Sequence, residues 1–288
     1  MKILVFGKNG QVAREVQRRS GAVDLEIRGS DEANFESPEA CAAFVAASGA
    51  DAVINAAAYT AVDKAESEEA LAALVNGTTP GAIARACAAG GIPLVHISTD
   101  YVFDGTGTAP FATDHPTSPL GAYGRTKLAG EEAVRAAGGA HAILRTSWVV
   151  SAHGNNFVKT MLRLGTERAR LSIVADQTGG PPPAADIADA CFSIARHLIA
   201  DPAKSGSYHF SGAPDISWAG FAREIFALAG LSCAVAEIPA SAYPTPAQRP
   251  LNSPRLARRA AGHSRRSWRI ENLKTGHFKP KFMNKADP

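Results

Sequence analysis

The sequence predicts an α/β fold: a Rossmann-type, doubly wound parallel sheet with a smaller C-terminal substrate-binding domain. Three observations predict it. Short apolar runs alternate with alanine-rich helical stretches through the first 150 residues. The apolar runs are continuous, as in strands that are buried on both faces of a parallel sheet. Two glycines directly follow the first run, where folds of this class bind phosphate groups.

Local sequence features predict each strand and helix. The apolar runs predict strands over 2–6, 25–27, 52–58, 92–98 and 141–150. The stretches between them predict helices over 11–19, 38–48, 63–76 and 122–138. Pro38 stands in a first helical turn, where its missing N–H is tolerated, and acids begin the third helix, where the dipole favours them. After residue 150 the elements are shorter and interrupted by segments such as "DQTGGPPPAAD".

This pattern divides the chain into three parts. Residues 1–150 are the expected NAD(P)-binding domain, residues 151–256 the substrate domain, and residues 257–288 an atypical basic tail. From residue 255 onward the chain carries ten of its 30 basic and two of its 27 acidic residues, so the net charge of +3 conceals a mildly acidic body. The tail shows no apolar period, and we expect it to be disordered.

Composition excludes several classes of function. An apolar share of 45% and a charged share of 20% are ordinary for a soluble enzyme. No apolar run approaches the ~18 residues of a membrane helix. The four cysteines are scattered without metal-ligand spacing, so we expect reduced thiols and a cytoplasmic protein. The basic tail lacks regularly interleaved aromatics and any known binding module, so nucleic acid is not an expected partner.

The stretch "FGKNGQVA" joins a strand end to a helix start. It places Gly7 and Gly10 in the turn and the small Ala13 in the first helical turn. Glycines there let the backbone approach a pyrophosphate, whose charge the helix N-terminus stabilises. A plain tight turn is the alternative, but the position at the head of an alternating chain favours a dinucleotide.

The end of the second expected strand, "EIRGSDE", bears on the choice of cofactor. An acid at this point binds the ribose hydroxyls of NAD, whereas the guanidinium of Arg28 suits the 2′-phosphate of NADPH. We therefore expect NADPH as the cofactor. NADH is the alternative, because Asp31 and Glu32 lie close to the same point. An exposed loop arginine with no such role is the alternative for Arg28.

Three segments should meet at the carboxyl ends of the strands: "NAAAYT", "HISTDYVFDG" and "YGRTK". The last places Tyr123 and Lys127 four apart, on one face of a helix. Reduction of a carbonyl needs a proton donor, which Tyr123 provides if the Lys127 ammonium and the positive nicotinamide lower the pKa of its phenol from about 10. Lys127 can also hold the nicotinamide ribose, and Thr99 can hydrogen-bond the carbonyl oxygen. Alone the pair would be ordinary surface residues, but together these segments predict a catalytic site.

These motifs resemble the extended short-chain dehydrogenase/reductase superfamily, and within it the dTDP-4-dehydrorhamnose reductase family. The matching segments, spread over residues 1–254, are "FGKNGQV", "NAAAYTAVDKAESE", "STDYVFDG", "YGRTKLAGE", "RTSWVVSAHGNNFVKTML", "DQTGGPP" and "AYPTPAQRPLNS". The resemblance implies NADPH- or NADH-dependent reduction of the C4 ketone of dTDP-4-dehydro-L-rhamnose, a dTDP-linked 6-deoxyhexulose. The product, dTDP-L-rhamnose, serves cell-surface polysaccharide.

The resemblance also implies roles for individual residues. It makes Tyr123 the proton donor and Thr99 the group that tunes it. It implies that the cofactor is touched by Gly10, Gln11, Val12, Ala58, Tyr59, Thr60 and Lys127. It implies that the sugar nucleotide is touched by Thr99, Asp100 and Trp148, although core packing is the alternative for Trp148. We extend the substrate site to Asn156, for sugar hydroxyls, and to Arg249, as a bidentate partner of the diphosphate, with a surface role as its alternative.

The chain departs from the family pattern in two places. Some relatives bind Mg²⁺ between subunits through glutamates, of which Glu15 matches one, whereas Ala185 stands where a second acid is needed. One carboxylate cannot satisfy a cation that prefers about six oxygens, so no metal site is expected. A homodimer stays possible, but its mode is open. The second departure is the tail, which replaces the amphipathic helix that ends the family pattern.

Two alternatives stay open. One is another extended-family sugar-nucleotide enzyme, an epimerase or a dehydratase, although "STDYVF" lacks the glutamate that dehydratases use beside Asp100. The other is a non-catalytic regulatory subunit that binds cofactor, against which the intact Thr99, Tyr123 and Lys127 argue.

Overall fold

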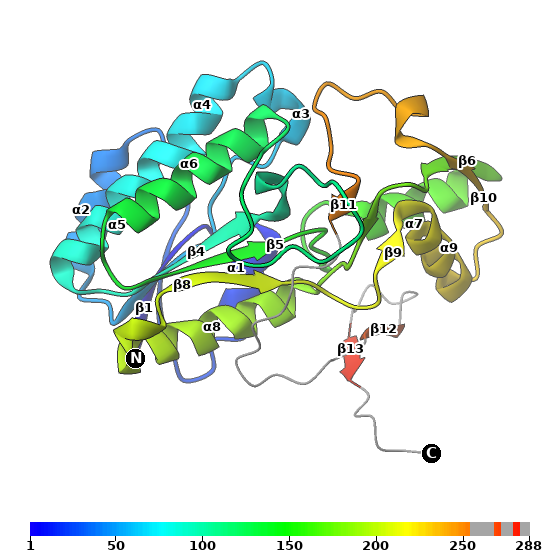
Figure 1. Ribbon diagram of the computed structural model, residues 1–288. Coiled ribbons are helices and arrows are strands. Elements are labelled where there is room, and N and C mark those ends of the chain that lie inside the picture. The colour runs from blue at the N-terminus through cyan, green and yellow to red at the C-terminus, as the bar shows by residue number, and fades with distance from the viewer. Residues whose placement is uncertain (254–267, 272–278, 283–288) are drawn as a thin grey trace.

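A six-stranded parallel sheet forms the larger of two units in the computed structural model (Figure 1). The structure describes residues 1–253, together with the backbone of residues 268–271 and 279–282. In spatial order the strands are β2 (Asp24–Arg28), β1 (Lys2–Phe6), β3 (Ala52–Asn55), β4 (Leu94–Thr99), β5 (His141–Thr146) and β8 (Gly206–Phe210). All neighbours pair in parallel, so the predicted Rossmann-type sheet is confirmed.

Helices cover both faces of this sheet. One face carries α1 (Gln11–Arg18) and α8 (Ala184–Ala200), and the other carries α2 (Pro38–Ser48), α5 (Thr79–Gly90) and α6 (Ala122–Ala136). Between β3 and α5 the chain forms α3 (Val62–Ala65), α4 (Glu69–Ala73) and the π-helical turn η1 (Leu74–Thr78). The 3-10 turn η2 (Asp100–Val102) follows β4.

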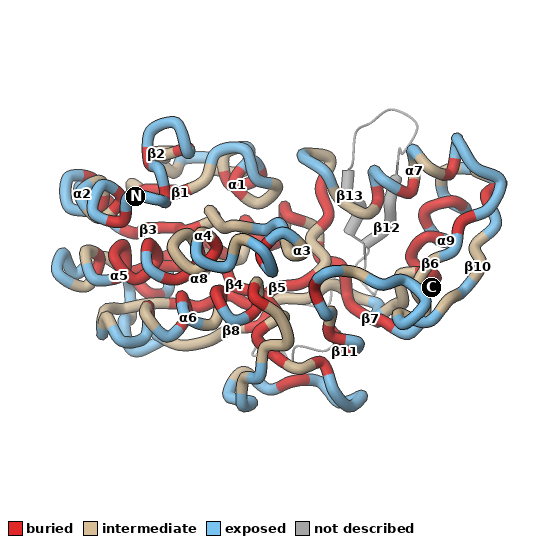
Figure 2. The backbone as a smooth tube through the Cα atoms, turned by 90° about the horizontal axis from the view of Figure 1, so that it is seen from above, coloured by how far each residue is buried: buried red, intermediate tan, exposed pale blue. Residues whose placement is uncertain are grey.

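Strand β1 shows why these strands are continuously apolar. Ile3 and Val5 pack into the core beneath α1 and α8, whereas Leu4 and Phe6 pack into the core beneath α2 and α5. All four side chains are fully buried. Burial of each side chain contributes about 1.5–3 kcal/mol to the free energy of unfolding, compared with an exposed side chain. Figure 2 shows the same distribution, with buried backbone along the strands and exposed backbone on the outer helices.

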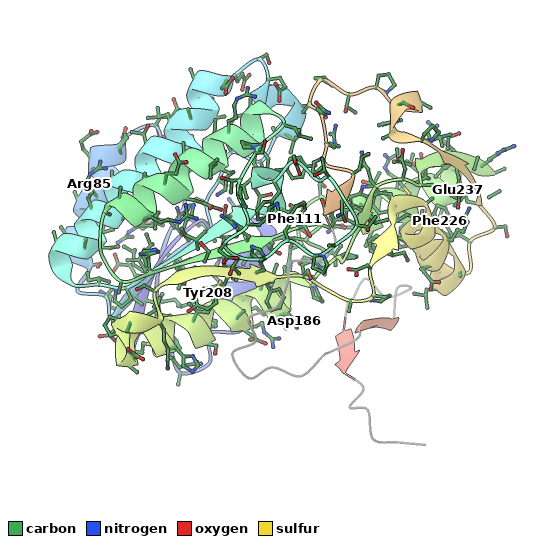
Figure 3. All side chains as sticks on the ribbon, viewed as in Figure 1. Arg85, Phe111, Asp186, Tyr208, Phe226 and Glu237 are labelled. Carbon is green, nitrogen blue, oxygen red and sulfur yellow. The ribbon has the colours of Figure 1, made fainter. Side chains whose placement is uncertain are left out.

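The second, smaller unit has its own core. Helices α7 (Phe157–Glu167) and α9 (Trp218–Ala229) pack on the two-stranded sheet of β6 (Arg170–Val174) and β10 (Ala234–Ile238). A three-stranded sheet joins β11 (Asn252–Ser253), β7 (Thr178–Gly179) and β9 (Ile216–Ser217). The 3-10 turn η4 (Ala240–Ala242) follows β10, whereas the 3-10 turn η3 (Pro202–Lys204) links α8 to β8 in the larger unit. Phe226 on α9 and Arg85 on α5 mark the two units at opposite ends of Figure 3.

The chain crosses between the units more than once. Residues 184–210, which the sequence assigned to the substrate domain, supply α8 and the edge strand β8 to the larger unit. The expected boundary at residue 150 therefore marks the first crossing only. The expectation of a disordered tail over 257–288 falls mostly outside the described residues. Within it, β12 (Trp268–Glu271) and β13 (Lys279–Phe282) pair antiparallel.

Three predicted elements end earlier or break. The strand predicted over 52–58 ends at Asn55, whose side-chain oxygen accepts a hydrogen bond from Ala57 N at 3.1 Å and turns the chain. The strand predicted over 141–150 ends at Thr146, because Trp148 adopts a φ of 51°. The helix predicted over 63–76 is divided into α3, α4 and the start of η1. Among the described residues, no helix has the length and apolar character needed to cross a membrane.

Candidate active site

The sheet order reverses direction between β1 and β3, and the loops at their carboxyl ends part at this point. In open α/β sheets such a switch point opens a crevice for ligands. The Gly7 loop follows β1, the "AYT" segment follows β3, and Thr99 ends β4. The predicted cofactor and catalytic segments therefore lie at one edge of the sheet.

The glycine loop fits a pyrophosphate by its backbone. Gly7 has a φ of 109°, and a Cβ there would lie 3.2 Å from the backbone of Ala56 and Ala57. Only glycine allows the loop to pass this close to the end of β3. Gly10 is the N-cap of α1 and makes no side-chain cap, and a Cβ there would meet no described atom within 4 Å. Gly10 itself is exposed, and the first N–H groups of any helix have no partner within it, so the start of α1 can bind an anion.

Arg28 lies at the predicted place but is already paired. Its guanidinium donates to Glu26 Oε1 at 2.6 Å and to Glu32 Oε1 at 3.2 Å, and lies over the ring of Phe44. The backbone oxygen of Arg28 accepts from Gly7 N at 2.8 Å, which ties β2 to the glycine loop. A 2′-phosphate at this position would compete with two carboxylates for the guanidinium.

The segment Ala58–Thr60 is held by a residue that the sequence reasoning missed. Asn76, buried within η1, accepts from Tyr59 N at 2.9 Å and donates to Tyr59 O at 3.1 Å. Its amide also lies 3.2 Å from Thr126 Oγ1 on α6. One side chain thus links the segment after β3 to the helix of Tyr123. The signal was an asparagine inside an otherwise apolar helical run.

Tyr123, Thr99 and Asp100 form one hydrogen-bonded group. Thr99 Oγ1 donates to Asp100 Oδ1 at 3.1 Å and accepts from Tyr101 N at 3.2 Å. Thr99 also shares a hydrogen bond with the Tyr123 hydroxyl, which by itself lowers the pKa of the phenol. The ring of Tyr101 packs edge-on against that of Tyr123, with centroids 5.4 Å apart.

The pKa values of this group follow from burial. Burial raises the pKa of Tyr123 to about 12 and outweighs the hydrogen bond with Thr99, which lowers it. The expectation that Lys127 and the positive nicotinamide lower this pKa concerns the complex with cofactor; in the protein alone, desolvation of the phenolate dominates. Burial also raises the pKa of Asp100 to about 6, against the hydroxyls of Ser253 and Thr99, which lower it. Ser253 comes from β11 of the smaller unit, and the sequence reasoning missed it.

Lys127 is almost wholly buried beneath α6. Only 2% of it is exposed, and Nζ donates to Ile97 O at 2.8 Å. Burial lowers the pKa of this ammonium to about 8, and the charge of Glu131 acts in the opposite direction. Glu131 itself is bound by the guanidinium of Arg145 and the hydroxyl of Ser98.

Trp148 lies at the junction of the two units. Its ring stacks on that of Trp218 with centroids 3.3 Å apart, and a Cβ on Gly179 would lie 2.6 Å from it. A φ of 51° is strained for a bulky residue and costs about 1–3 kcal/mol. Such strain marks functional positions, so the structure accommodates both the packing and the substrate interpretations of Trp148.

The two residues of our extension have partners within the chain. Asn156 is the N-cap of α7: Oδ1 accepts from Lys159 N, and Nδ2 donates to Gln11 Oε1 and to Ser151 O. This side chain has a structural role and offers few free groups to a sugar. Arg249 donates to Asp63 Oδ2 on α3 at 2.8 Å. A diphosphate would have to displace Asp63 from the guanidinium.

The acid that suggested a metal site is engaged in ion pairs. Glu15 pairs with Arg18 at 2.8 Å and lies 3.5 Å from His153 Nε2. Ala185 is buried in α8. In the part of the chain that the structure describes, no three histidine, cysteine or acidic side chains are grouped as a metal site requires.

Known proteins are similar to this chain in sequence and in fold. A family model described as the RmlD substrate binding domain matches residues 1–275. The dTDP-4-dehydrorhamnose reductases of Sinorhizobium fredii and Salmonella typhimurium are each 45% identical to the chain, over 88% of it and 88% of their own length. The crystal structure of dTDP-4-dehydrorhamnose reductase from Bacillus anthracis in complex with NADP is similar with a TM-score of 0.83 and 34% identity. That similarity covers 88% of this chain and 89% of that one.

Proposed function

The chain belongs to the RmlD substrate binding domain family, and from this membership we propose how its residues perform the family's reaction. The protein reduces the C4 ketone of dTDP-4-dehydro-L-rhamnose to dTDP-L-rhamnose with NADPH. The observation that supports the assignment of residues is the hydrogen bond between Thr99, which ends β4, and Tyr123 of α6, the helix that also carries Lys127.

Tyr123 is the proton donor of this proposal. The reaction adds a hydride from NADPH to C4 and a proton to the ketone oxygen. With a pKa of about 12 in the protein alone, the phenol is protonated at neutral pH, as a donor must be, and so is a phenol of ordinary pKa. Its hydrogen goes to the ketone oxygen in the reduction. Thr99 hydrogen-bonds the same oxygen once its own hydrogen turns from Asp100 to the substrate.

The cofactor fits the residues present. The start of α1, at Gly10, Gln11 and Val12, suits its pyrophosphate, because the first N–H groups of a helix have no partner within it. Ala58, Tyr59 and Thr60, which follow β3, contact the cofactor in this proposal. The Lys127 ammonium suits its ribose hydroxyls.

The substrate site and the reading of the 2′-phosphate are also part of the proposal. Asp100 and Trp148 contact the sugar nucleotide, Arg249 releases Asp63 to bind the diphosphate, and Arg28 reads the 2′-phosphate of NADPH. Asn156 positions Gln11 and the start of α7 instead of binding sugar.

The test is NADPH oxidation by the full chain, with dTDP-4-dehydro-L-rhamnose and with no sugar. Oxidation that requires the sugar, with dTDP-L-rhamnose as the product, supports the proposal. Conversion of sugar nucleotide without net NADPH consumption would indicate an epimerase or dehydratase. Cofactor binding without any turnover would indicate a regulatory subunit.

We further propose a cytoplasmic homodimer. All four cysteines in the described residues are free and buried, which suits a reducing compartment. The basis for a dimer is family resemblance. Sedimentation at several protein concentrations tests it, and a single species of monomer mass at every concentration would refute it.

A further inference from the structure

Helix α6, which carries Tyr123, begins without a local cap. Its N-cap residue is Gly121, which has no side chain to accept a hydrogen bond from the first turn. The first N–H groups of a helix have no partner within it, so an outside acceptor stabilises them. Tyr123 is the second residue of this helix. The position of its phenol therefore depends on how the first turn is held.

Glu66 provides that acceptor from a distant part of the chain. Its Oε1 accepts from Ala122 N at 2.8 Å, across 56 positions of sequence. The approach is close, because a Cβ on Gly121 would lie only 2.6 Å from the same oxygen. This contact gives a reason for glycine at Gly121, whose φ of −129° any residue can adopt.

The segment that bears Glu66 also holds the substrate side of the site. Three residues earlier, Asp63 on α3 accepts from Ala247 N at 3.2 Å and from Arg249 Nη2 at 2.8 Å. Figure 1 shows the segment after β10 returning past α3. One short stretch therefore contacts both the start of the catalytic helix and the loop proposed to bind the diphosphate.

We propose that Glu66 is a positioning residue of the reduction: it caps α6 from outside and holds the Tyr123 phenol against Thr99. The inference rests on the proposed function, because it takes Tyr123 as the proton donor. Glu66 does not touch the reacting atoms. Its loss frays the first turn of α6 and misplaces the phenol, which lowers turnover more than it lowers affinity for NADPH.

The experiment compares Glu66→Ala, Glu66→Gln and the control Glu69→Ala. Glu69 lies in the following α4 and binds Arg125 of α6 in an exposed bidentate pair, so its loss removes a contact to α6 but not the cap. We expect Glu66→Ala to lower kcat roughly ten-fold with an unchanged Kd for NADPH. Glu66→Gln, which keeps the acceptor oxygen, should recover most of the loss, and Glu69→Ala should stay within about two-fold of wild type.

Hydrogen exchange of the NADPH complex gives a second measurement that does not need turnover. The first turn of α6 should exchange faster in Glu66→Ala, and not in the other two variants. Unchanged exchange, an unchanged kcat in Glu66→Ala, or an equal loss in Glu69→Ala would each overturn the role of Glu66. An inactive wild-type protein would instead refute the proposed function, on which this role depends.

Discussion

Replacing Lys127 by methionine should make the protein more stable and less active. Only 2% of Lys127 is exposed, and within the described residues its ammonium donates to Ile97 O at 2.8 Å and to no carboxylate. Burial lowers the pKa of Lys127 from 10.5 to about 8. The charged ammonium, which is the form present at neutral pH, therefore destabilises the folded state. Methionine keeps the apolar stem and removes that charge.

The size of the effect follows from the shift in pKa. A change from 10.5 to about 8 corresponds to about 3 kcal/mol against the charged form in the folded state. The lost hydrogen bond to Ile97 O offsets about 1–2 kcal/mol. The free energy of unfolding of Lys127→Met should therefore exceed that of wild type by about 1–2 kcal/mol at neutral pH.

The pH dependence has a definite sign. Below pH 8 both states of wild type bind the proton, and the full penalty is present. Between about pH 8 and 10.5 the unfolded state binds more protons than the folded state, so wild-type stability rises with pH. The advantage of the variant should therefore shrink by about 1 kcal/mol or more on going from about pH 7 to about pH 9.5.

Urea denaturation of both proteins at the two pH values measures this difference. Lys159→Met on α7 is the control, because Lys159 is exposed and its loss should change stability by less than about 0.5 kcal/mol at either pH. Binding of NADPH to Lys127→Met should weaken and kcat should fall. A variant that is less stable than wild type at neutral pH, or an advantage that does not vary with pH, would refute the reasoning.

Three further predictions concern other parts of the molecule. Tyr123→Phe should lower kcat roughly 10²-fold or more with little change in the Kd for NADPH, and near wild-type turnover would remove Tyr123 as the proton donor. Arg28→Ala should weaken NADPH binding by about 1–3 kcal/mol and NADH binding much less, as isothermal calorimetry can measure; equal losses would contradict a role at the 2′-phosphate. Glu131→Ala leaves the buried Arg145 without its ion-pair partner and should lower the free energy of unfolding by about 3–5 kcal/mol. The exposed Glu167→Ala is its control in the same denaturation assay, with an expected change below about 1 kcal/mol, and similar losses in both would argue against the burial argument.

The parts of the fold that the sequence predicted are those set by local periodicity. Four consecutive apolar residues in β1 indicate a strand buried on both faces, and this inference does not depend on the topology of the rest of the chain. A Tyr-x-x-x-Lys spacing lies on one helix face because the helix repeat is local, so α6 could be predicted around Tyr123 and Lys127. The turn at Gly7 could also be predicted, because a glycine directly after a strand is a local signal.

The tertiary structure alone decided which partner each polar group has. Arg249 faces Asp63, Asn156 caps α7, and Glu66 reaches Ala122, and in the first and last of these the partners lie far apart in the sequence. No residue pattern encodes such pairs, because they depend on which loops meet after the sheet is assembled. The return of α8 and β8 into the larger unit is likewise a matter of topology.

The same division explains the electrostatics of the site. From the sequence, Tyr123 and Lys127 are a phenol and an ammonium four residues apart, and opposite charges at that spacing suggest a lowered pKa for the phenol. In the folded protein, burial raises the pKa of Tyr123 to about 12 and lowers that of Lys127 to about 8. The sequence determined that these two groups share one face of a helix, because spacing along a helix is local. The structure determined their protonation, because desolvation depends on everything packed around them.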